Sequence, residues 1–194
     1  MYHSFNKYHH DEQGVKELNF PNYLDIFSKL SKVLYIGIGD DIDGLEELVQ
    51  RHSYVVGIDK YLCSDSTHFH NQCGNFLKRR NDMLKKYPNL HIRKMDAKDL
   101  DYPNEYFDGV IFKRSLAYMG DGWGINIDGI KLVLNNVHNV LCENGLTWII
   151  YGEPDVINLK VDTIKSLIKT SGFEIIEDKE DYMICRKEVK HSIV

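Results

Sequence analysis

The sequence predicts one doubly wound α/β domain, with a mostly parallel seven-stranded sheet and an antiparallel strand at its C-terminal end. Three observations support this fold class. Short apolar runs alternate with amphipathic stretches along most of the chain, as in repeated strand–helix units. A glycine turn, Gly37-Ile38-Gly39, follows the first of these runs. The last two apolar runs are joined by a short charged turn, Glu177 to Asp181, so we expect them to pair antiparallel.

Seven apolar runs bounded by glycine, proline or charged residues are predicted to be strands. They are 32–37, 54–58, 90–95, 107–112, 146–151, 173–176 and 182–185, the fifth being entered through Asn144-Gly145. Apolar residues at helical spacing predict helices at about 21–31, 42–49, 69–87, 130–141 and 157–168. Right-handed crossovers between parallel strands then put a ligand beyond their carboxyl ends, where the strand order reverses.

The composition fits an ordinary globular protein. The 194 residues are 43% hydrophobic and 27% charged, with a formal charge of -5, which argues against a disordered chain or a fibrous repeat. No apolar run has the length that a membrane span needs, and Met1 to His10 lack the apolar core of a signal peptide. We therefore expect a cytoplasmic protein with reduced cysteines, and no association with membranes. We divide it into an N-terminal lid or helical segment, 1–31, and a ligand-binding α/β domain, 32–194.

The glycine turn and the end of the next strand suggest a nucleoside site. Glycines let the backbone approach a ligand closely, and Asp59, at the end of the second strand, can accept hydrogen bonds from ribose hydroxyls. The third glycine of a dinucleotide fingerprint is missing, because Asp40 and Asp41 stand there. Two carboxylates would repel a pyrophosphate, so NAD and FAD are disfavoured and a ligand with positive groups is favoured. The alternative is a tight turn without a ligand.

Four segments in this order resemble the class I S-adenosylmethionine-dependent methyltransferases. They are KVLYIGIGDD at 32–41, VVGIDK at 55–60, MDAKDLDYPNEYFDGVIFKRSLAYM at 95–119 and NVLCENGLTWIIYGE at 139–153. The expected antiparallel hairpin at the C-terminus is also a feature of that family. The resemblance implies a methyltransferase-like Rossmann fold, S-adenosylmethionine as cofactor and methyl transfer as activity.

The resemblance also implies a set of cofactor-binding residues. The glycine turn would line the methionine part of the cofactor, Asp59 would hold the ribose and Asp96 with Ala97 would contact the adenine. Phe112 and Lys113 would border the reacting methyl group. The whole set is Gly37, Gly39, Asp40, Asp41, Asp59, Lys60, Asp96, Ala97, Phe112 and Lys113. Many members of the family carry an acid at the position of Tyr35, and Asp40 or Asp41 would have to replace it here.

The sequence does not assign a catalytic base. A sulfonium methyl group is already activated, so a base is needed only for some acceptors. The candidates lie at the N-terminus, in the segment 114–128 after the fourth strand and after the fifth strand: His9, His10, Tyr118, Asp121 and Glu153. A small-molecule acceptor is expected, with a protein acceptor as the alternative. No basic, aromatic-rich groove for nucleic acid is evident, and the spacing of the Cys63–Cys73 run matches no metal site.

Two other functions stay open. Tyr35 and the altered glycine turn are compatible with a binding or scaffold protein that keeps the fold without catalysis. The GIGDD turn also resembles that of the aminopropyltransferases of polyamine synthesis. Their acidic motif after the fourth strand has no counterpart here, where the chain reads KRSLAYM.

Overall fold

The computed structural model describes most of the chain from the end of its N-terminal segment onward. The described residues are 27, 29–39, 41–60, 62, 72–113, 115–116, 119, 126–150, 160–180 and 182–189, with only the backbone described for 72–76. The predicted N-terminal helix lies almost entirely outside this part.

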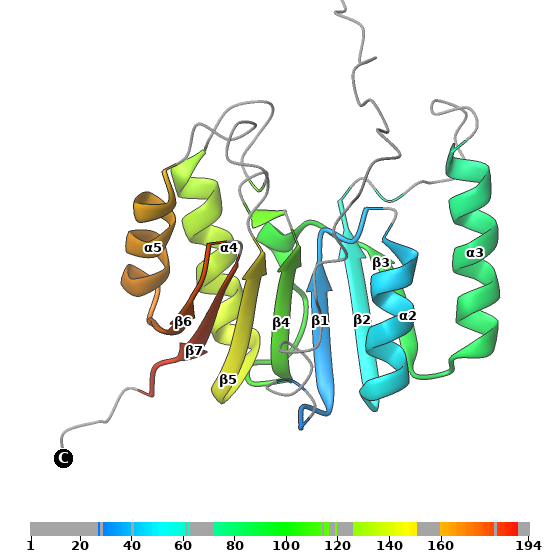
Figure 1. Cartoon of the computed structure of the whole chain (residues 1–194), viewed down its shortest axis with the longest axis horizontal. Coiled ribbons are helices and arrows are strands. Elements are labelled where there is room, and N and C mark those ends of the chain that lie inside the picture. Colours follow the sequence, from blue (N-terminus) through cyan, green and yellow to red (C-terminus); the bar gives the residue numbers. More distant parts are fainter. Residues whose placement is uncertain are drawn as a thin grey trace, which may run out of the picture.

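All seven predicted strands form one sheet, in the order β3-β2-β1-β4-β5-β7-β6. Their bounds are β1 Lys32–Ile36, β2 Tyr54–Asp59, β3 Leu90–Lys94, β4 Phe107–Lys113, β5 Leu141–Ile150, β6 Phe173–Asp178 and β7 Tyr182–Lys187. The first five strands are parallel, and β7 pairs antiparallel with both β5 and β6. The predicted doubly wound sheet with an antiparallel C-terminal strand is therefore confirmed (Figure 1).

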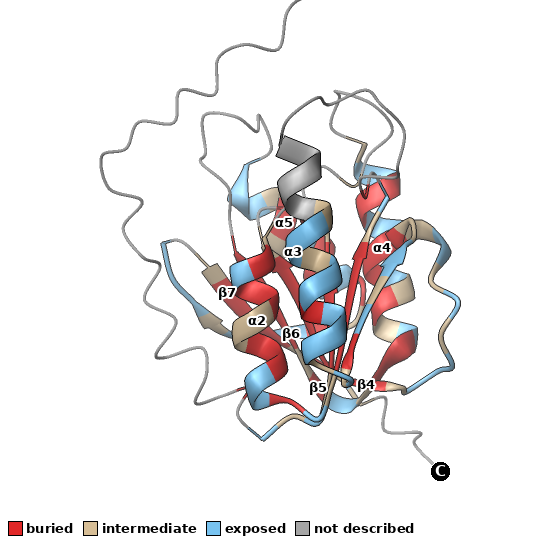
Figure 2. Cartoon of the chain, turned by 90° about the vertical axis from the view of Figure 1, so that its right-hand side faces the viewer, coloured by how far each residue is buried: buried red, intermediate tan, exposed pale blue. Residues whose placement is uncertain are grey.

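Helices cover both faces of the sheet and bury two apolar layers. α2 (Ile42–Arg51) and α3 (Gln72–Lys86) follow β1 and β2, while α4 (Ile127–Val140) and α5 (Val161–Thr170) follow β4 and β5. Alternate residues of β1 point to opposite faces: Val33 and Tyr35 join the layer under α2, and Leu34 and Ile36 join the layer under α4. Figure 2 shows the buried strands between α2 and α4. β1 therefore has the near-continuous apolar sequence of a strand covered on both faces.

The start of β5 differs from the sequence prediction. We expected Leu141 to end a helix and the strand to begin at Leu146, but α4 ends at Val140 and β5 begins at Leu141. Leu141 is fully buried and pairs with Phe107, and the register then shifts so that Leu146 pairs with Gly109. Asn144 has a φ of 57° within this irregularity. Asn144 and Gly145 therefore lie in an irregularity within β5 and not in a turn before it.

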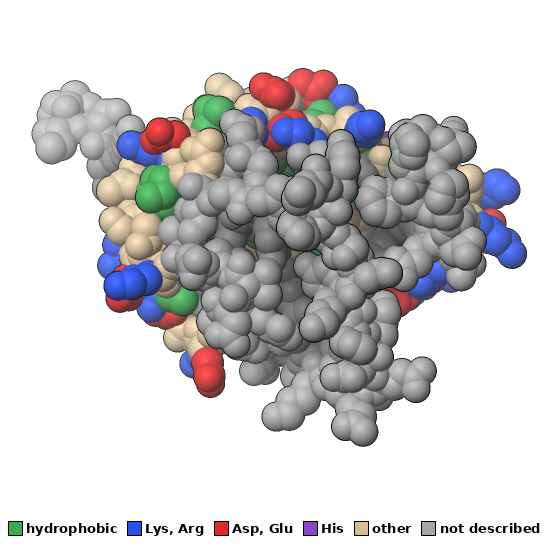
Figure 3. Space-filling view, turned by 90° about the horizontal axis from the view of Figure 1, so that it is seen from above, with side chains coloured by type: hydrophobic (Ala, Val, Ile, Leu, Met, Phe, Trp, Pro, Cys, Tyr) green, Lys and Arg blue, Asp and Glu red, His purple; other side chains and the backbone are tan. Residues whose placement is uncertain are grey.

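α3 carries a basic cluster of mostly exposed side chains, Lys78, Arg79, Arg80, Lys85 and Lys86. Arg79 forms an ion pair with Asp43 of α2, and Lys86 forms one with Glu46 at 2.8 Å. From above, onto the carboxyl ends of the parallel strands, Lys and Arg side chains are interspersed with Asp and Glu around the described rim (Figure 3). No helix among the described residues is long and apolar enough to cross a membrane.

A side chain of β4 binds the backbone at the start of β1, the strand beside it. The Asp108 carboxylate in β4 accepts hydrogen bonds from the backbone N–H groups of Ser31, at 3.0 Å, and Lys32, at 2.8 Å. Asp108→Ala should therefore lower the free energy of unfolding by about 1 to 2 kcal/mol, because both N–H groups lose their acceptor. Urea denaturation measures this, with Asp82→Ala on the exposed face of α3 as the control. Equal midpoints for the two variants would contradict it.

Candidate functional site

The candidate site lies where the strand order reverses. β1 is flanked by β2 on one side and β4 on the other, and the chain reaches β4 only after passing through β2 and β3. In open α/β sheets this switch point leaves a crevice outside the carboxyl ends of the two central strands. In Figure 1 these ends point upward. The residues that follow β1, β2, β3 and β4 therefore converge there.

The glycine turn after β1 is held in place by backbone contacts. Gly37 and Gly39 have φ angles of 73° and 50°, a region that favours glycine. The N–H groups of Gly37 and Ile38 both donate to the carbonyl of Ile58 in β2, at 2.8 and 3.2 Å. A Cβ on Gly37 would lie 2.4 Å from the Cβ of Ser115, whereas one on Gly39 would meet no atom of the described residues within 4 Å. Gly37 is thus required by packing, whereas Gly39 has no described side chain packed against it.

Ser115 lies in the candidate site, although no sequence pattern selects it. It is 8% exposed, follows β4 and donates a hydrogen bond from Oγ to the carbonyl of Ile36 at 2.8 Å. This bond closes the end of β1 against the segment after β4. A serine in that segment carries no spacing signal, so only the three-dimensional contact identifies it.

The structure brings Asp59, which we expect to hold a ribose, to the glycine turn. Asp59 is the last residue of β2, and its Oδ2 accepts a hydrogen bond from the N–H of Gly39 at 2.9 Å. The bond orients the carboxylate at the carboxyl edge of the sheet. The two oxygens of a carboxylate together offer about four acceptor positions, so such a group can bind several donors.

Asp96, Ala97 and Lys60 form a second group next to Asp59. Lys60 Nζ lies 2.8 Å from Asp96 Oδ2, and the N–H of Lys98 donates to Asp96 Oδ1 at 3.0 Å. Partial burial alone would raise the pKa of Asp96, but the bonds from Lys60 and Lys98 outweigh it and lower the pKa below its ordinary value of 3.8. Ala97 is buried. The ionised Asp96 is therefore the form that this group stabilises.

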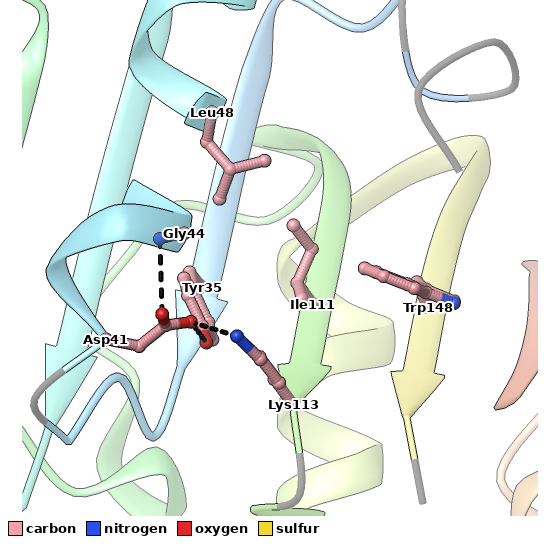
Figure 4. Close-up of a pocket in the computed structure, with 7 residues that line it drawn as sticks. All are labelled: Tyr35, Asp41, Gly44, Leu48, Ile111, Lys113 and Trp148. Carbon is pink, nitrogen blue, oxygen red and sulfur yellow. Dashed lines mark hydrogen bonds and ion pairs between the residues drawn. The ribbon is translucent and has the colours of Figure 1, made fainter. Parts of the chain in front are cut away.

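Asp41 occupies an unexpected position. Its Oδ2 accepts hydrogen bonds from the Tyr35 hydroxyl at 2.5 Å and from Lys113 Nζ at 2.7 Å, while Oδ1 accepts from the N–H of Gly44 at 3.2 Å and caps α2. Figure 4 shows the carboxylate between the Tyr35 and Lys113 side chains, at the carboxyl ends of β1 and β4. The side chains of Asp41 and Lys113 are 23% and 24% exposed. The sequence selected both residues but did not predict their contact.

Tyr35, Asp41 and Lys113 line a small crevice on the α2 side of the sheet. Its other walls are Gly44 and three apolar side chains, Leu48, Ile111 and Trp148. Phe112, which we expected beside the reacting methyl group, is fully buried in the layer under α4. Its side chain points to the other face of β4, so only Lys113 of that predicted pair has its side chain at this crevice.

Several predicted residues lie outside the described part of the chain. They are Asp40 of the cofactor-binding set and all five candidate bases, His9, His10, Tyr118, Asp121 and Glu153. The side chains of the Cys63–Cys73 run also lie outside it. Among the residues that the structure does describe, no group of three or more His, Cys, Asp or Glu side chains is arranged to hold a metal ion.

Replacing the two glycines of the turn separates packing from backbone conformation. Gly37→Ala and Gly39→Ala both place a side chain at positive φ, but only Gly37→Ala also collides with Ser115, whose Cβ is fixed to the backbone. Gly37→Ala should therefore destabilise the fold by at least about 1 kcal/mol more than Gly39→Ala. Urea denaturation of both variants measures the difference. Equal losses would mean that Ser115 yields to the added methyl group.

The lowered pKa of Asp96 predicts a pH-dependent contribution to stability. A carboxyl group whose pKa is lower in the folded than in the unfolded state stabilises the fold above its unfolded pKa and loses this effect as the pH falls. The stability difference between the wild type and Asp96→Asn should therefore be constant from pH 7 to 5 and shrink below about pH 4, near the ordinary value of 3.8. Denaturation at several pH values measures it. A difference that stays constant down to pH 3 would contradict the assignment.

Sequence comparison gives no relative, whereas comparison of structures gives many. No protein-family model matches the chain, and no curated protein sequence matches it. N-methyltransferase NodS from Bradyrhizobium japonicum superposes with a TM-score of 0.61 at 14% identity, covering 82% of this chain and 87% of NodS. The 1,6-didemethyltoxoflavin-N1-methyltransferase from Burkholderia thailandensis, solved with bound 1,6-didemethyltoxoflavin and S-adenosylhomocysteine, gives 0.63 at 15% identity, covering 86% and 75%.

A protein of different activity is equally similar. The [4+2]-cyclase SpnF superposes with a TM-score of 0.63 at 13% identity, covering 87% of this chain and 80% of the cyclase. At such low sequence identity, structural similarity shows a shared fold but not a shared reaction. The strand order and the antiparallel β7 agree with these neighbours. The chain therefore has the fold of the class I S-adenosylmethionine-dependent methyltransferases.

Proposed function

We propose that this chain binds S-adenosylmethionine at the carboxyl ends of β1 to β4 and transfers its methyl group to a small-molecule acceptor. The observation that carries the proposal is the hydrogen bond from Gly39 N–H to Asp59 Oδ2 at 2.9 Å. It joins a positive-φ glycine turn to an acid at the end of the next strand, at the switch point of the sheet. A nucleoside with free ribose hydroxyls fits this pairing.

The residues around that bond fit the other parts of the cofactor. No described residue lies within 4 Å of the position that a Cβ on Gly39 would take, which leaves the backbone there accessible to a ligand as far as the described part of the chain is concerned. Asp96 is held ionised and oriented by Lys60 and by the N–H of Lys98, so it can accept a hydrogen bond from an exocyclic amine of adenine. The acids Asp41, Asp59 and Asp96 outnumber Lys60 and Lys113, which favours a ligand with positive charge.

The protein's contribution to methyl transfer would be positioning and exclusion of water. When bound, S-adenosylmethionine supplies a sulfonium methyl group that is already activated. The chain has to align the acceptor with the carbon–sulfur bond, and alignment can supply on the order of 7 to 11 kcal/mol of barrier reduction at best. The candidate bases His9, His10, Tyr118, Asp121 and Glu153 would serve acceptors that must lose a proton. A small-molecule acceptor agrees with one of the structural neighbours named above, the methyltransferase solved with bound 1,6-didemethyltoxoflavin.

The second candidate is a protein that keeps this fold without methyl transfer. Two observations favour it: Tyr35 stands where many methyltransferases carry an acid, and a cyclase superposes as well as the methyltransferases do. The two candidates differ in turnover. Conversion of S-adenosylmethionine to S-adenosylhomocysteine with an acceptor supports the first, and binding without conversion over a broad acceptor screen supports the second.

Ligand-dependent stability tests the proposed cofactor. At 100 times its dissociation constant, a ligand that binds only the folded state adds about 2.7 kcal/mol of stability. S-adenosylmethionine and S-adenosylhomocysteine should therefore raise the melting temperature of the wild type in a saturable way. Asp59→Ala should reduce this shift strongly, because the ribose hydroxyls lose their acceptor, whereas Asp82→Ala on α3 should keep it.

Two outcomes would contradict this proposal. If neither ligand shifts the melting temperature of the wild type, the chain does not use this cofactor. If Asp59→Ala keeps the full shift at subsaturating ligand, the cofactor binds elsewhere.

A further inference from the structure

We propose that the edge of the sheet at β3, together with the flank of α3 beside it, binds an extended acidic segment of a partner protein as an additional strand. Among the described strands, β3 pairs with β2 alone and lies at one end of the strand order. An edge strand leaves a row of backbone N–H and C=O groups that the sheet does not pair. Addition of a strand to such a row is a general mode of peptide recognition. The inference does not depend on the proposed cofactor.

Positive charge is concentrated around this edge. Residues 72–98, which span α3 and β3, contain eight Lys and Arg and two Asp, a net charge of +6, although the whole chain carries -5. The rest of the chain therefore has a net charge of -11. Four of the eight cations form no ion pair with any described residue: Lys78, Arg80, Lys85 and Lys94. Such uncompensated charge attracts a negatively charged partner.

One flank of α3 faces the edge of the sheet. Arg79 and Lys86 form ion pairs with acids of α2, so they mark the flank toward α2. At about 100° per residue, Leu84 lies roughly 140° around the helix from Arg79, on the opposite flank, and Arg80 is its neighbour there. Leu84 is 37% exposed. Because α3 lies outside α2 in the molecule, this flank is directed to the open edge (Figure 1).

β3 adds apolar and basic side chains to the same strip. Leu90 and Ile92 belong to the apolar layer under α2 and α3, and alternate residues of a strand share a face, so Lys94 points to this side as well. Ile92 is half-buried and Lys94 is exposed. The strip between helix and edge thus carries Leu84, Ile92 and two cations, Arg80 and Lys94. An added strand would place apolar side chains beside Ile92 and acidic ones beside Lys94.

The other face of β3 is occupied by contacts within the chain. Arg93 binds both carboxylate oxygens of Asp101 at 2.9 Å, and its guanidinium group lies 5.3 Å from the centre of the Tyr102 ring. The His91 ring lies 4.8 Å from that of Tyr54. The cations without a described partner are therefore on α3 and on the α3 side of the strand.

An extended peptide fits this surface better than a nucleic acid does. A phosphate backbone would match the positive charge. It would not pair with the backbone groups of an edge strand, and it would leave Leu84 and Ile92 against charged oxygens. A peptide that alternates apolar and acidic residues satisfies the backbone groups, the apolar side chains and the cations together.

A second copy of the chain fits less well. Its β3 would bring like charges together. Its other edge strand, β6, is acidic, but the pairing of β6 with β7 is irregular between Ile175 and Glu177, and such a bulge interrupts an edge. The acids of β6, Glu174, Glu177 and Asp178, already bind side chains of their own chain.

NMR titration of the isotopically labelled full chain tests the proposal. The probe is a capped hexapeptide of alternating valine and glutamate, added at low ionic strength. Chemical-shift changes should be confined to β3 and α3. The backbone amides of β3 that are not bonded to β2 should become at least about tenfold more protected from hydrogen exchange, because an added strand accepts from them. A hexapeptide of alternating valine and lysine should not bind.

Variants separate the two parts of the surface. Lys94→Glu should weaken the acidic peptide at least about tenfold, because attraction becomes repulsion. Leu84→Ser should weaken it about threefold through loss of an apolar contact. Both side chains are exposed, so both variants should fold. Lys169→Glu is the matched control, because it changes the net charge equally at an exposed position of α5, on the opposite side of the molecule, and should stay within about twofold of the wild type.

Three results would overturn the proposal: no binding of the acidic peptide at millimolar concentration, binding without protection of the β3 amides, or equal losses in Lys94→Glu and Lys169→Glu. Tighter binding of an oligothymidylate at the same residues would assign the surface to nucleic acid instead. Concentration-dependent growth of the wild type in sedimentation, abolished by Lys94→Glu, would assign it to a second copy. None of these results bears on whether the chain binds S-adenosylmethionine.

Discussion

The hydrogen bonds of the Asp41 carboxylate join the elements that meet at the carboxyl end of the central strand, β1. The carboxylate bonds to Tyr35 in β1, to the N–H of Gly44 in α2 and to Lys113 in β4. These are the elements that meet at the switch point, where an open α/β sheet has its crevice. The glycine turn lies between Tyr35 and Asp41, so these contacts hold its two ends, while the N–H groups of Gly37 and Ile38 hold it against β2. The position of the turn against Asp59 follows from these contacts, and with it the shape of the candidate ligand site.

Much of the fold could be predicted because β1, β2 and β4 are covered on both faces and their sequences are almost continuously apolar. The short turn before β7 likewise required an antiparallel pair. The predicted start of β5 was wrong for a physical reason. Leu141 continues the apolar stripe of α4, so the helical spacing of the apolar residues does not show that the backbone of Leu141 already pairs with Phe107. Leu141 would be buried in either a helix or a strand, and only its pairing with a residue far away in the sequence makes it part of the strand.

The candidate site could be predicted in part. Gly39 and Asp59 were selected as members of one site, and their hydrogen bond brings them together. The contact between Asp41 and Lys113 could not be predicted, because it joins residues 72 positions apart and depends on how α2 sits on the sheet. From the sequence, Tyr35 indicated that an acid which binds the ligand in many methyltransferases is missing here. In the structure it supports an acid supplied from the loop, so the same substitution that favoured a scaffold protein is also compatible with a binding site.

The proposed function requires the nucleoside to lie across the ends of β1 to β4, with its ribose at Asp59. A crystal structure of the chain with S-adenosylhomocysteine tests this most directly. We expect both ribose hydroxyls to lie within hydrogen-bond distance of the Asp59 carboxylate, with the thioether beyond the glycine turn. Density for the ligand at another surface, or a ribose directed away from Asp59 with the turn unoccupied, would contradict it.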